Sequence, residues 1–94
     1  MIESFADEET EKIFHGRVSR KLPTTIQKTA RRKLLYLDDV DDLRDLRSPP
    51  GNRLEPLHGD HAGQYSIRIN EQWRICFYWE DGKAKQVKIE DYHG

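Results

Sequence analysis

Residues 64–79, QYSIRINEQWRICFYW, decide the fold. Apolar side chains alternate with polar ones on both sides of residues 70–72, and a period of two is typical of half-buried β-strands. The stretch therefore predicts a β-hairpin. Both apolar sets face the same way only if residues 70–72 form a three-residue loop, because a shift of one residue turns a whole strand over. The predicted pairs are Ile69 with Trp73, Ile67 with Ile75, and Tyr65 with Phe77.

The opposite face of this hairpin carries two arginines. In the same register Arg68 lies directly across from Arg74. Like charges at opposite positions of a ladder destabilise a sheet unless an anion lies between them, so the pair indicates a phosphate site on an exposed sheet face. Trp73 and Trp79 point to the other face, where we assign them to core packing rather than to stacking on bases.

A last strand is predicted near Val87, after a loop at residues 80–82 in which Gly82 takes a positive φ. A three-residue loop pairs Val87 with Ile75. The same register adds a third cation to the exposed face. The predicted basic row across three strands is Arg68, Arg74 and Lys88.

Two helices are predicted before the sheet. The first covers about residues 5–15, with Ser4 in a capping position and Gly16 as its stop. The second opens after Pro23 and ends in the aspartates of residues 38–42, because carboxylates at a helix C-terminus oppose the helix dipole. Its apolar positions recur at helical spacing and are Ile26, Ala30, Leu34 and Leu37.

These elements predict an α+β fold in one domain, residues 1–94. The two helices must cover the apolar face of a twisted, mostly antiparallel sheet, whose other face stays free. A third strand near residues 53–57, with a further short one at residues 1–5, brings the sheet to about four to five strands. Placing Leu54 inward sets Arg53 and Glu55 outward beside Arg68.

The net charge of −1 hides a division of charge along the chain. Residues 12–37 hold eight Lys or Arg and no acid, whereas residues 38–45 hold five Asp. The basic stretch is a candidate for binding nucleic acid, and by composition it is equally compatible with a solvated helix face. The candidate nucleic-acid-binding residues of this part of the chain are Arg20, Lys21, Lys28, Arg31 and Arg32.

A lone cysteine, Cys76, excludes an internal disulfide and a Cys-x-x-Cys metal pair. We interpret it as a small packing residue rather than a nucleophile. No apolar run approaches membrane-spanning length, and the first residues lack the basic and apolar regions of a secretory signal. We therefore expect a cytoplasmic protein, and we expect no metal and no cofactor.

A row of cations without a cluster of metal ligands points to phosphate binding or to phosphoryl chemistry. Cleavage of RNA by 2′-hydroxyl attack needs a base, a cation for the charged phosphorane and an acid for the leaving 5′-oxygen. Polar residues at one end of the exposed face supply one of each kind. The candidate catalytic set is Glu55, Arg74 and His93, and the alternative is a merely solvated polar row.

Three motifs together resemble the HigB and YoeB branch of the RelE-type bacterial toxins, which are ribosome-dependent mRNA endonucleases of toxin–antitoxin pairs. They are RLEPLHGD at residues 53–60, GQYSIRINEQWRICF at residues 63–77 and EDYH at residues 90–93. PPGNR at residues 49–53 and MIxSF at residues 1–5 resemble the HigB and GraT group in particular. The resemblance implies two helices on a twisted antiparallel sheet and metal-independent cleavage of mRNA in the ribosomal A site.

The resemblance also implies roles for single residues. Glu55 stands where YoeB-like toxins have a catalytic glutamate and HigB-like toxins have histidine. Arg74 matches the phosphate-stabilising arginine, and His93 matches the C-terminal histidine that acts as acid or base. Asp91 and Tyr92 match the acidic and aromatic residues of HigB tails, where Tyr92 either stacks on a base or packs on the sheet.

His58 departs from the family pattern, which commonly has lysine at this position. Lysine is charged near neutral pH, whereas histidine is only partly charged, so His58 would bind phosphate more weakly. The alternative is that His58 is a loop residue without a role in binding. We assign His61 to the loop as well. The remaining residues expected to support RNA binding are Arg53, Arg68 and Lys88.

The partners that the resemblance implies are a cognate helix-turn-helix antitoxin and the 70S ribosome with mRNA. The ribosome-binding residues are then expected to be Arg20, Lys21, Lys28, Arg31 and Arg32. Operator DNA would be bound only through the antitoxin, and no membrane is involved. The alternative function is a non-enzymatic inhibitor of the same fold, like the ParE toxins that bind gyrase. ParE-like chains generally lack the charged site, so the candidate catalytic set favours the nuclease. A third alternative is an RNA-binding module that neither cuts RNA nor poisons a target.

Overall fold

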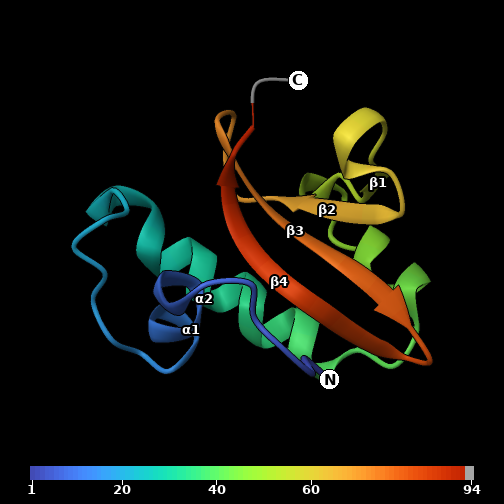
Figure 1. Ribbon diagram of the computed structural model, residues 1–94, viewed down its shortest axis with the longest axis horizontal. Helices are drawn as coiled ribbons and strands as arrows, with labels where there is room; N and C mark the ends of the chain where they lie inside the picture. Colours follow the sequence, from blue (N-terminus) through green and yellow to red (C-terminus); the bar gives the residue numbers. More distant parts are fainter. Residues whose placement is uncertain (93–94) are drawn as a thin grey trace.

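The computed structural model describes residues 1–92 and has two layers (Figure 1). Within these residues, one layer is an antiparallel sheet of four strands in the order β1-β2-β3-β4. The other layer holds two helices that cover one face of the sheet, which confirms the predicted fold class. The elements in chain order are α1 (Glu8–Phe14), α2 (Thr24–Asp39), β1 (Glu55–Pro56), β2 (Gln64–Arg68), β3 (Trp73–Glu80) and β4 (Lys83–Asp91).

The β2–β3 hairpin has the predicted register. The side chain of Asn70 holds its loop by accepting hydrogen bonds from the backbone N–H groups of Gln72 and Trp73, each at 2.8 Å. The apolar side chains of both strands therefore face the helices. The pairs include Tyr65 with Phe77, Ile67 with Ile75, and Arg68 with Arg74.

The β3–β4 pairing differs from the prediction by two residues. The strands join through a tight turn at Asp81 and Gly82, whose φ values of 53° and 75° suit a two-residue hairpin. A bulge then adds one residue to β4, where Gln86 takes a φ of 50°. The shorter turn and the bulge each shift the register by one, so Ile75 pairs with Ile89. An even shift keeps every side chain on its predicted face.

This shift corrects the predicted basic row. Lys88 lies opposite Cys76, and Glu90 lies opposite Arg74. The third place in the row with Arg68 and Arg74 therefore belongs to an acid rather than to a lysine.

Helix α1 begins later than predicted. The side chain of Asp7 caps it by accepting a hydrogen bond from the Thr10 N–H at 2.8 Å. The predicted capping residue, Ser4, instead accepts a hydrogen bond from the Gln86 N–H at 2.9 Å. Residues 1–5 thus run beside β4, which they meet through isolated parallel bridges rather than as a full strand.

Helix α2 forms where predicted and supplies the centre of the core. Trp73 and Trp79 pack against this core while partly buried, which confirms their assignment to packing. Within residues 1–92, no helix is long and apolar enough to cross a bilayer. The core joins Ile26, Ala30, Leu34 and Leu37 of α2 to Ile67, Ile75, Phe77, Val87 and Ile89 of the sheet.

Candidate functional site

The guanidinium of Arg74 lies on the sheet face that the helices leave free, near the end of the sheet where β3 begins. Its Nη1 donates one hydrogen bond to the Ser66 Oγ at 2.8 Å and another to the Arg53 carbonyl oxygen at 3.3 Å. Ser66 is fully buried, and the side chain of Arg74 is only 11% exposed. A cation held by two different segments has little rotational freedom, so the sheet presents this charge at a defined position.

A carboxylate lies beside this cation. Glu55 pairs with Ser66 in the β1–β2 ladder, and its Oε1 is 3.5 Å from the Nη2 of Arg74. The side chain of Glu55 is 50% exposed and therefore accessible to a ligand. Its ion-pair partner is thus Arg74 rather than Arg68, next to which the sequence placed it.

The end of β4 crosses the same end of the sheet. The Arg74 Cζ lies 5.7 Å from the centre of the Tyr92 ring, within the range of a cation–π contact. The Tyr92 N–H donates to the Gln72 carbonyl at 2.8 Å, and the Gln72 side chain donates to Asp91 at 3.0 Å. These bonds hold the tail next to Arg74, as predicted. His93, the third member of the candidate catalytic set, lies outside the described residues.

The hydrogen bonds that the Arg74 side chain donates to described residues all come from one nitrogen of its guanidinium. Nη1 is used by Ser66 and by the carbonyl of Arg53. Among the described residues, Nε and Nη2 donate no hydrogen bond, and Glu55 approaches Nη2 only as an ion-pair partner. Nε and Nη2 share the edge of the planar fork that can donate two parallel hydrogen bonds to a phosphate.

Arg74 also lines a cavity that is rich in positive charge. It has a volume of about 340 Å³ and is lined by Arg53, Arg68 and Arg74 together with Asn70 and Glu71. Arg68 directs its guanidinium to Glu71 at 4.0 Å. Arg53 has a left-handed φ of 44°, an uncommon conformation for a residue with a side chain. Such a cavity suits the phosphates of a nucleic-acid backbone.

Lys88 is not part of this positive surface. It forms an ion pair with Glu90 at 3.5 Å instead of lying beside Arg74. Glu90 also lies 3.7 Å from the Nε2 of His61, so His61 lies against the exposed sheet face rather than standing free in its loop. His58 precedes the same short turn and is exposed, and its carbonyl accepts a hydrogen bond from the His61 N–H at 3.3 Å. Among the described residues, no hydrogen-bond or ion-pair partner is found for its side chain.

Cys76 lies in the row next to Arg74 and is completely buried. Its burial, followed by the negative charge of Glu90, raises the pKa of the thiol to about 12. The thiol is therefore protonated near neutral pH, and a protonated thiol is a poor nucleophile. This confirms the interpretation of Cys76 as a packing residue.

Sequence reasoning missed Ser66 and Glu90. Ser66 precedes Arg68 by two residues, so the alternation of the strand already places it on the arginine face. The alternation does not reveal that the Ser66 hydroxyl accepts a hydrogen bond from Arg74, which lies diagonally across from it on β3. Glu90 was missed because the bulge in β4, which brings it opposite Arg74 in place of Lys88, leaves no recognisable sequence pattern.

The predicted ribosome-binding residues lie on the helix layer. Lys28, Arg31 and Arg32 are exposed and follow one face of α2, since residues three and four apart are neighbours on a helix. Arg20 and Lys21 are exposed on the connection that precedes α2. The structure therefore separates these cations from Arg74, which points to the opposite side of the sheet.

The arrangement around Arg74 can hold a phosphodiester. The Nε and Nη2 edge of the guanidinium can bind two phosphate oxygens, and Glu55 is close enough to accept a proton from a hydroxyl of the same ligand. The Tyr92 ring adds an aromatic surface for a base. Within residues 1–92, no group of three or more His, Cys, Asp or Glu side chains is placed to hold a metal ion.

Comparison with known proteins identifies the family. The family profile described as the RelE-like toxin of type II toxin-antitoxin system HigB matches residues 3–93. Toxin HigB-1 of Vibrio cholerae serotype O1 is 42% identical over 73 residues, which cover 78% of this chain and 77% of that protein. Endoribonuclease HigB of Proteus vulgaris is 30% identical over 93 residues, which cover 99% of this chain and 100% of that protein.

A solved structure has the same fold. A chain of the YoeB-YefM complex from Staphylococcus aureus superposes with a TM-score of 0.56, and the match covers 100% of the present chain and 99% of the chain in that complex. At 17% identity this likeness shows the fold alone. The family profile covers nearly all of the chain, and the two HigB relatives align over most of it. The chain therefore belongs to the HigB family of RelE-like toxins of type II toxin–antitoxin systems.

Proposed function

We propose that this toxin is an endoribonuclease that cuts mRNA in the ribosomal A site by 2′-hydroxyl attack, without a metal ion. The observation that carries the proposal is the pairing of Arg74 with Glu55, in which a fixed cation lies 3.5 Å from an accessible carboxylate. The name of the Proteus vulgaris relative, Endoribonuclease HigB, supports the same activity. The substrate places the protein in the cytoplasm.

The proposed reaction divides the work among three residues. Glu55 takes the proton of the 2′-hydroxyl, whose oxygen attacks the neighbouring phosphorus. Arg74 stabilises the charge that develops on the phosphorane through the Nε and Nη2 edge of its guanidinium. His93 gives a proton to the 5′-oxygen as the bond from phosphorus to that oxygen breaks. The products are a 2′,3′-cyclic phosphate and a 5′-hydroxyl.

The surrounding residues position the RNA. Arg53 and Arg68 bind flanking phosphates in the cavity that they share with Arg74. Tyr92 stacks on a base, and Asp91 is held in the adjacent tail. His58, which follows β1, is a weaker substitute for the lysine common in the family.

The proposed partners are the ribosome and an antitoxin. Five exposed cations on α2 and just before it anchor the toxin on ribosomal RNA, since phosphate contacts position a protein without reading sequence. They are Arg20, Lys21, Lys28, Arg31 and Arg32. The antitoxin is a helix-turn-helix protein that also binds the operator, so the toxin reaches DNA only through it. Support for a protein antitoxin comes from the family and from the toxin–antitoxin complexes that share the fold.

The test is to map mRNA 5′ ends after the toxin is induced, beside a His93→Ala variant. We expect new 5′-hydroxyl ends inside reading frames with the natural chain and far fewer with the variant, because loss of the acid costs about a hundredfold in rate. Purified toxin should cut mRNA on programmed ribosomes in the presence of a chelator. Absence of new RNA ends, together with DNA breaks, would favour a gyrase inhibitor instead.

A further inference from the structure

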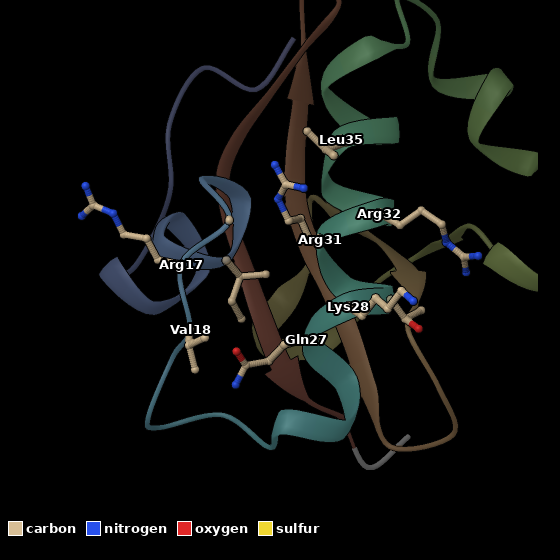
Figure 2. A pocket seen from close by; sticks show the side chains of 10 residues that line it. Arg17, Val18, Gln27, Lys28, Arg31, Arg32 and Leu35 are labelled. Carbon is tan, nitrogen blue, oxygen red and sulfur yellow. The ribbon is translucent and has the colours of Figure 1, made fainter.

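A groove on the helix layer lies outside the site around Arg74. Its volume is about 590 Å³, and it lies between the connection that follows α1 and one face of α2 (Figure 2). Ile13, Val18 and Leu35 supply its apolar lining. Neither the proposed cleavage reaction nor the core packing accounts for this groove.

The groove gathers exposed apolar side chains. Val18 is 72% exposed and Leu35 is 41% exposed. Within residues 1–92 the remaining large apolar residue that is exposed is Met1, at the start of the chain. Exposed apolar residues that gather in one hollow of a small domain mark a contact surface.

Unpaired cations surround this apolar surface. Arg17 projects from one rim, Lys28 and Arg32 project from the α2 side, and Arg31 lies between them (Figure 2). None of the four forms an ion pair with another described residue. The predicted basic row of the sheet is different, because each of its three cations has a carboxylate within 4.0 Å. The groove therefore offers positive charge that the chain itself does not neutralise.

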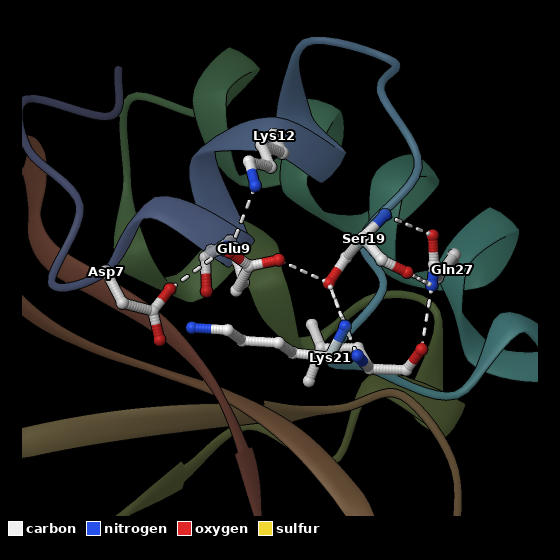
Figure 3. A network of polar contacts seen from close by, with 8 residues as sticks. Asp7, Glu9, Lys12, Ser19, Lys21 and Gln27 are labelled. Carbon is white, nitrogen blue, oxygen red and sulfur yellow. Dashed lines mark hydrogen bonds and ion pairs between the residues drawn. The ribbon is translucent and has the colours of Figure 1, made fainter.

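The wall of the groove is held in place by Ser19 (Figure 3). Its Oγ donates a hydrogen bond to Glu9 at 2.6 Å, and its N–H donates to the Gln27 side chain at 3.0 Å. The Gln27 amide donates in return to the carbonyls of Ser19 at 2.8 Å and of Leu22 at 2.9 Å. The neighbouring Val18 is thus presented by an ordered segment, and a preformed surface lowers the entropic cost of binding.

We infer that this groove binds an acidic amphipathic helix of the antitoxin. Apolar side chains of such a helix would fill the groove, and its carboxylates would meet the four cations. RNA alone would leave the apolar lining without a role, because phosphate contacts require only cations. The bound helix would cover Lys28, Arg31 and Arg32 and leave Arg74 open. The idea that the bound antitoxin inhibits the toxin by keeping it off the ribosome rests on the proposed function. The binding of the antitoxin helix in the groove does not depend on it.

The test separates the apolar surface from the charges. Val18→Ser and Leu35→Ser remove apolar contact without changing a cation or a core residue. We expect each to weaken binding of the antitoxin encoded beside the toxin gene by about tenfold or more, as for a central contact residue. Titration calorimetry measures this affinity with the full chain. Co-sedimentation of the same variants with 70S ribosomes should be unchanged.

A matched pair of variants tests the charges. Arg17→Ala removes a groove cation that has no proposed role on the ribosome, and we expect weaker antitoxin binding with a flatter salt dependence. Lys83→Ala removes one positive charge at the start of β4, outside the groove, and should leave antitoxin binding unchanged. Thermal melts of all variants check that the fold persists.

Three results would overturn the inference. The first is unchanged antitoxin binding by folded Val18→Ser and Leu35→Ser. The second is loss of ribosome association with antitoxin binding intact, which would assign the groove to RNA. The third is loss of self-association in these variants with antitoxin binding intact, which would assign the groove to a second copy of the chain. Because the measurement is binding, a failure to cut mRNA would defeat the proposed function alone.

Discussion

The hydroxyl of Ser66 and the guanidinium of Arg74 are joined by a hydrogen bond of 2.8 Å that runs diagonally from β2 to β3. The residue directly opposite Arg74 is Arg68, a pairing of like charges. The diagonal bond draws Arg74 toward Ser66 and Glu55, while Arg68 turns to Glu71 at 4.0 Å. Each arginine therefore has its own carboxylate, which offsets part of their mutual repulsion.

Replacing Arg74 tests the centre of the proposed site. Arg74→Ala should slow single-turnover cleavage of mRNA on programmed ribosomes by about a hundredfold or more, because the phosphorane loses its fixed cation. The thermal melt should stay close to that of the natural chain, since the side chain points away from the apolar core. Full activity in a folded Arg74→Ala protein would contradict the proposed site.

Ser66→Ala tests whether the hydroxyl positions Arg74. We expect the maximal rate to fall by about tenfold with little change in KM, because a loosened guanidinium meets the phosphate less often in the productive geometry. In an Arg74→Ala background the same change should cost nothing further. Cys76→Ala is the control, since Cys76 is equally buried and pairs with Ser66 in the ladder. Equal loss in both backgrounds would point to a general effect on the sheet.

Glu55→Gln separates a catalytic base from an ion-pair partner. If Glu55 takes the 2′-hydroxyl proton, the rate should fall by about a hundredfold at unchanged stability, because the amide keeps the shape and loses the basicity. If Glu55 only neutralises Arg74, the melting temperature should change more than the rate. Measuring both quantities on one preparation decides between the two roles.

The triple variant Lys28→Ala, Arg31→Ala, Arg32→Ala tests the basic face of α2. Ribosome association should weaken and its salt dependence should become flatter, because fewer counterions are released on binding. The positions of the cuts should not move. A triple variant that binds ribosomes with an unchanged salt slope would show that this face is merely solvated.

The buried thiol of Cys76 predicts a specific loss of stability in alkali. Its pKa is raised from 9.0 to about 12 in the folded chain, so above pH 9 the folded state holds a proton that the unfolded state releases. Stability contributed by this group therefore falls as pH rises through this range. Cys76→Ala should show a smaller decrease in the free energy of unfolding between pH 9 and 11. At pH 8 the natural thiol should react with a disulfide reagent only on unfolding.

The sequence by itself determined the hairpin and its faces. Because apolar and polar residues alternate in residues 64–79, Ile67, Ile75 and Phe77 are buried together in the observed register, whereas a shift of one residue would turn one strand over. The burial of apolar surface therefore selects the strand faces. The opposition of Arg68 and Arg74 follows from the same register. Helix α2 was equally predictable, because its apolar positions recur at helical spacing over many residues.

Only the tertiary structure decided which residues meet Arg74. The bulge at Gln86 moves Lys88 away and brings Glu90 opposite Arg74, and no local pattern of residues announces a bulge. The bond from Ser66 runs diagonally between strands and depends on how the guanidinium packs. Sequence periodicity specifies the face of each side chain, whereas a site is made by contacts between residues distant in the chain, and those contacts exist only once the strands are packed together.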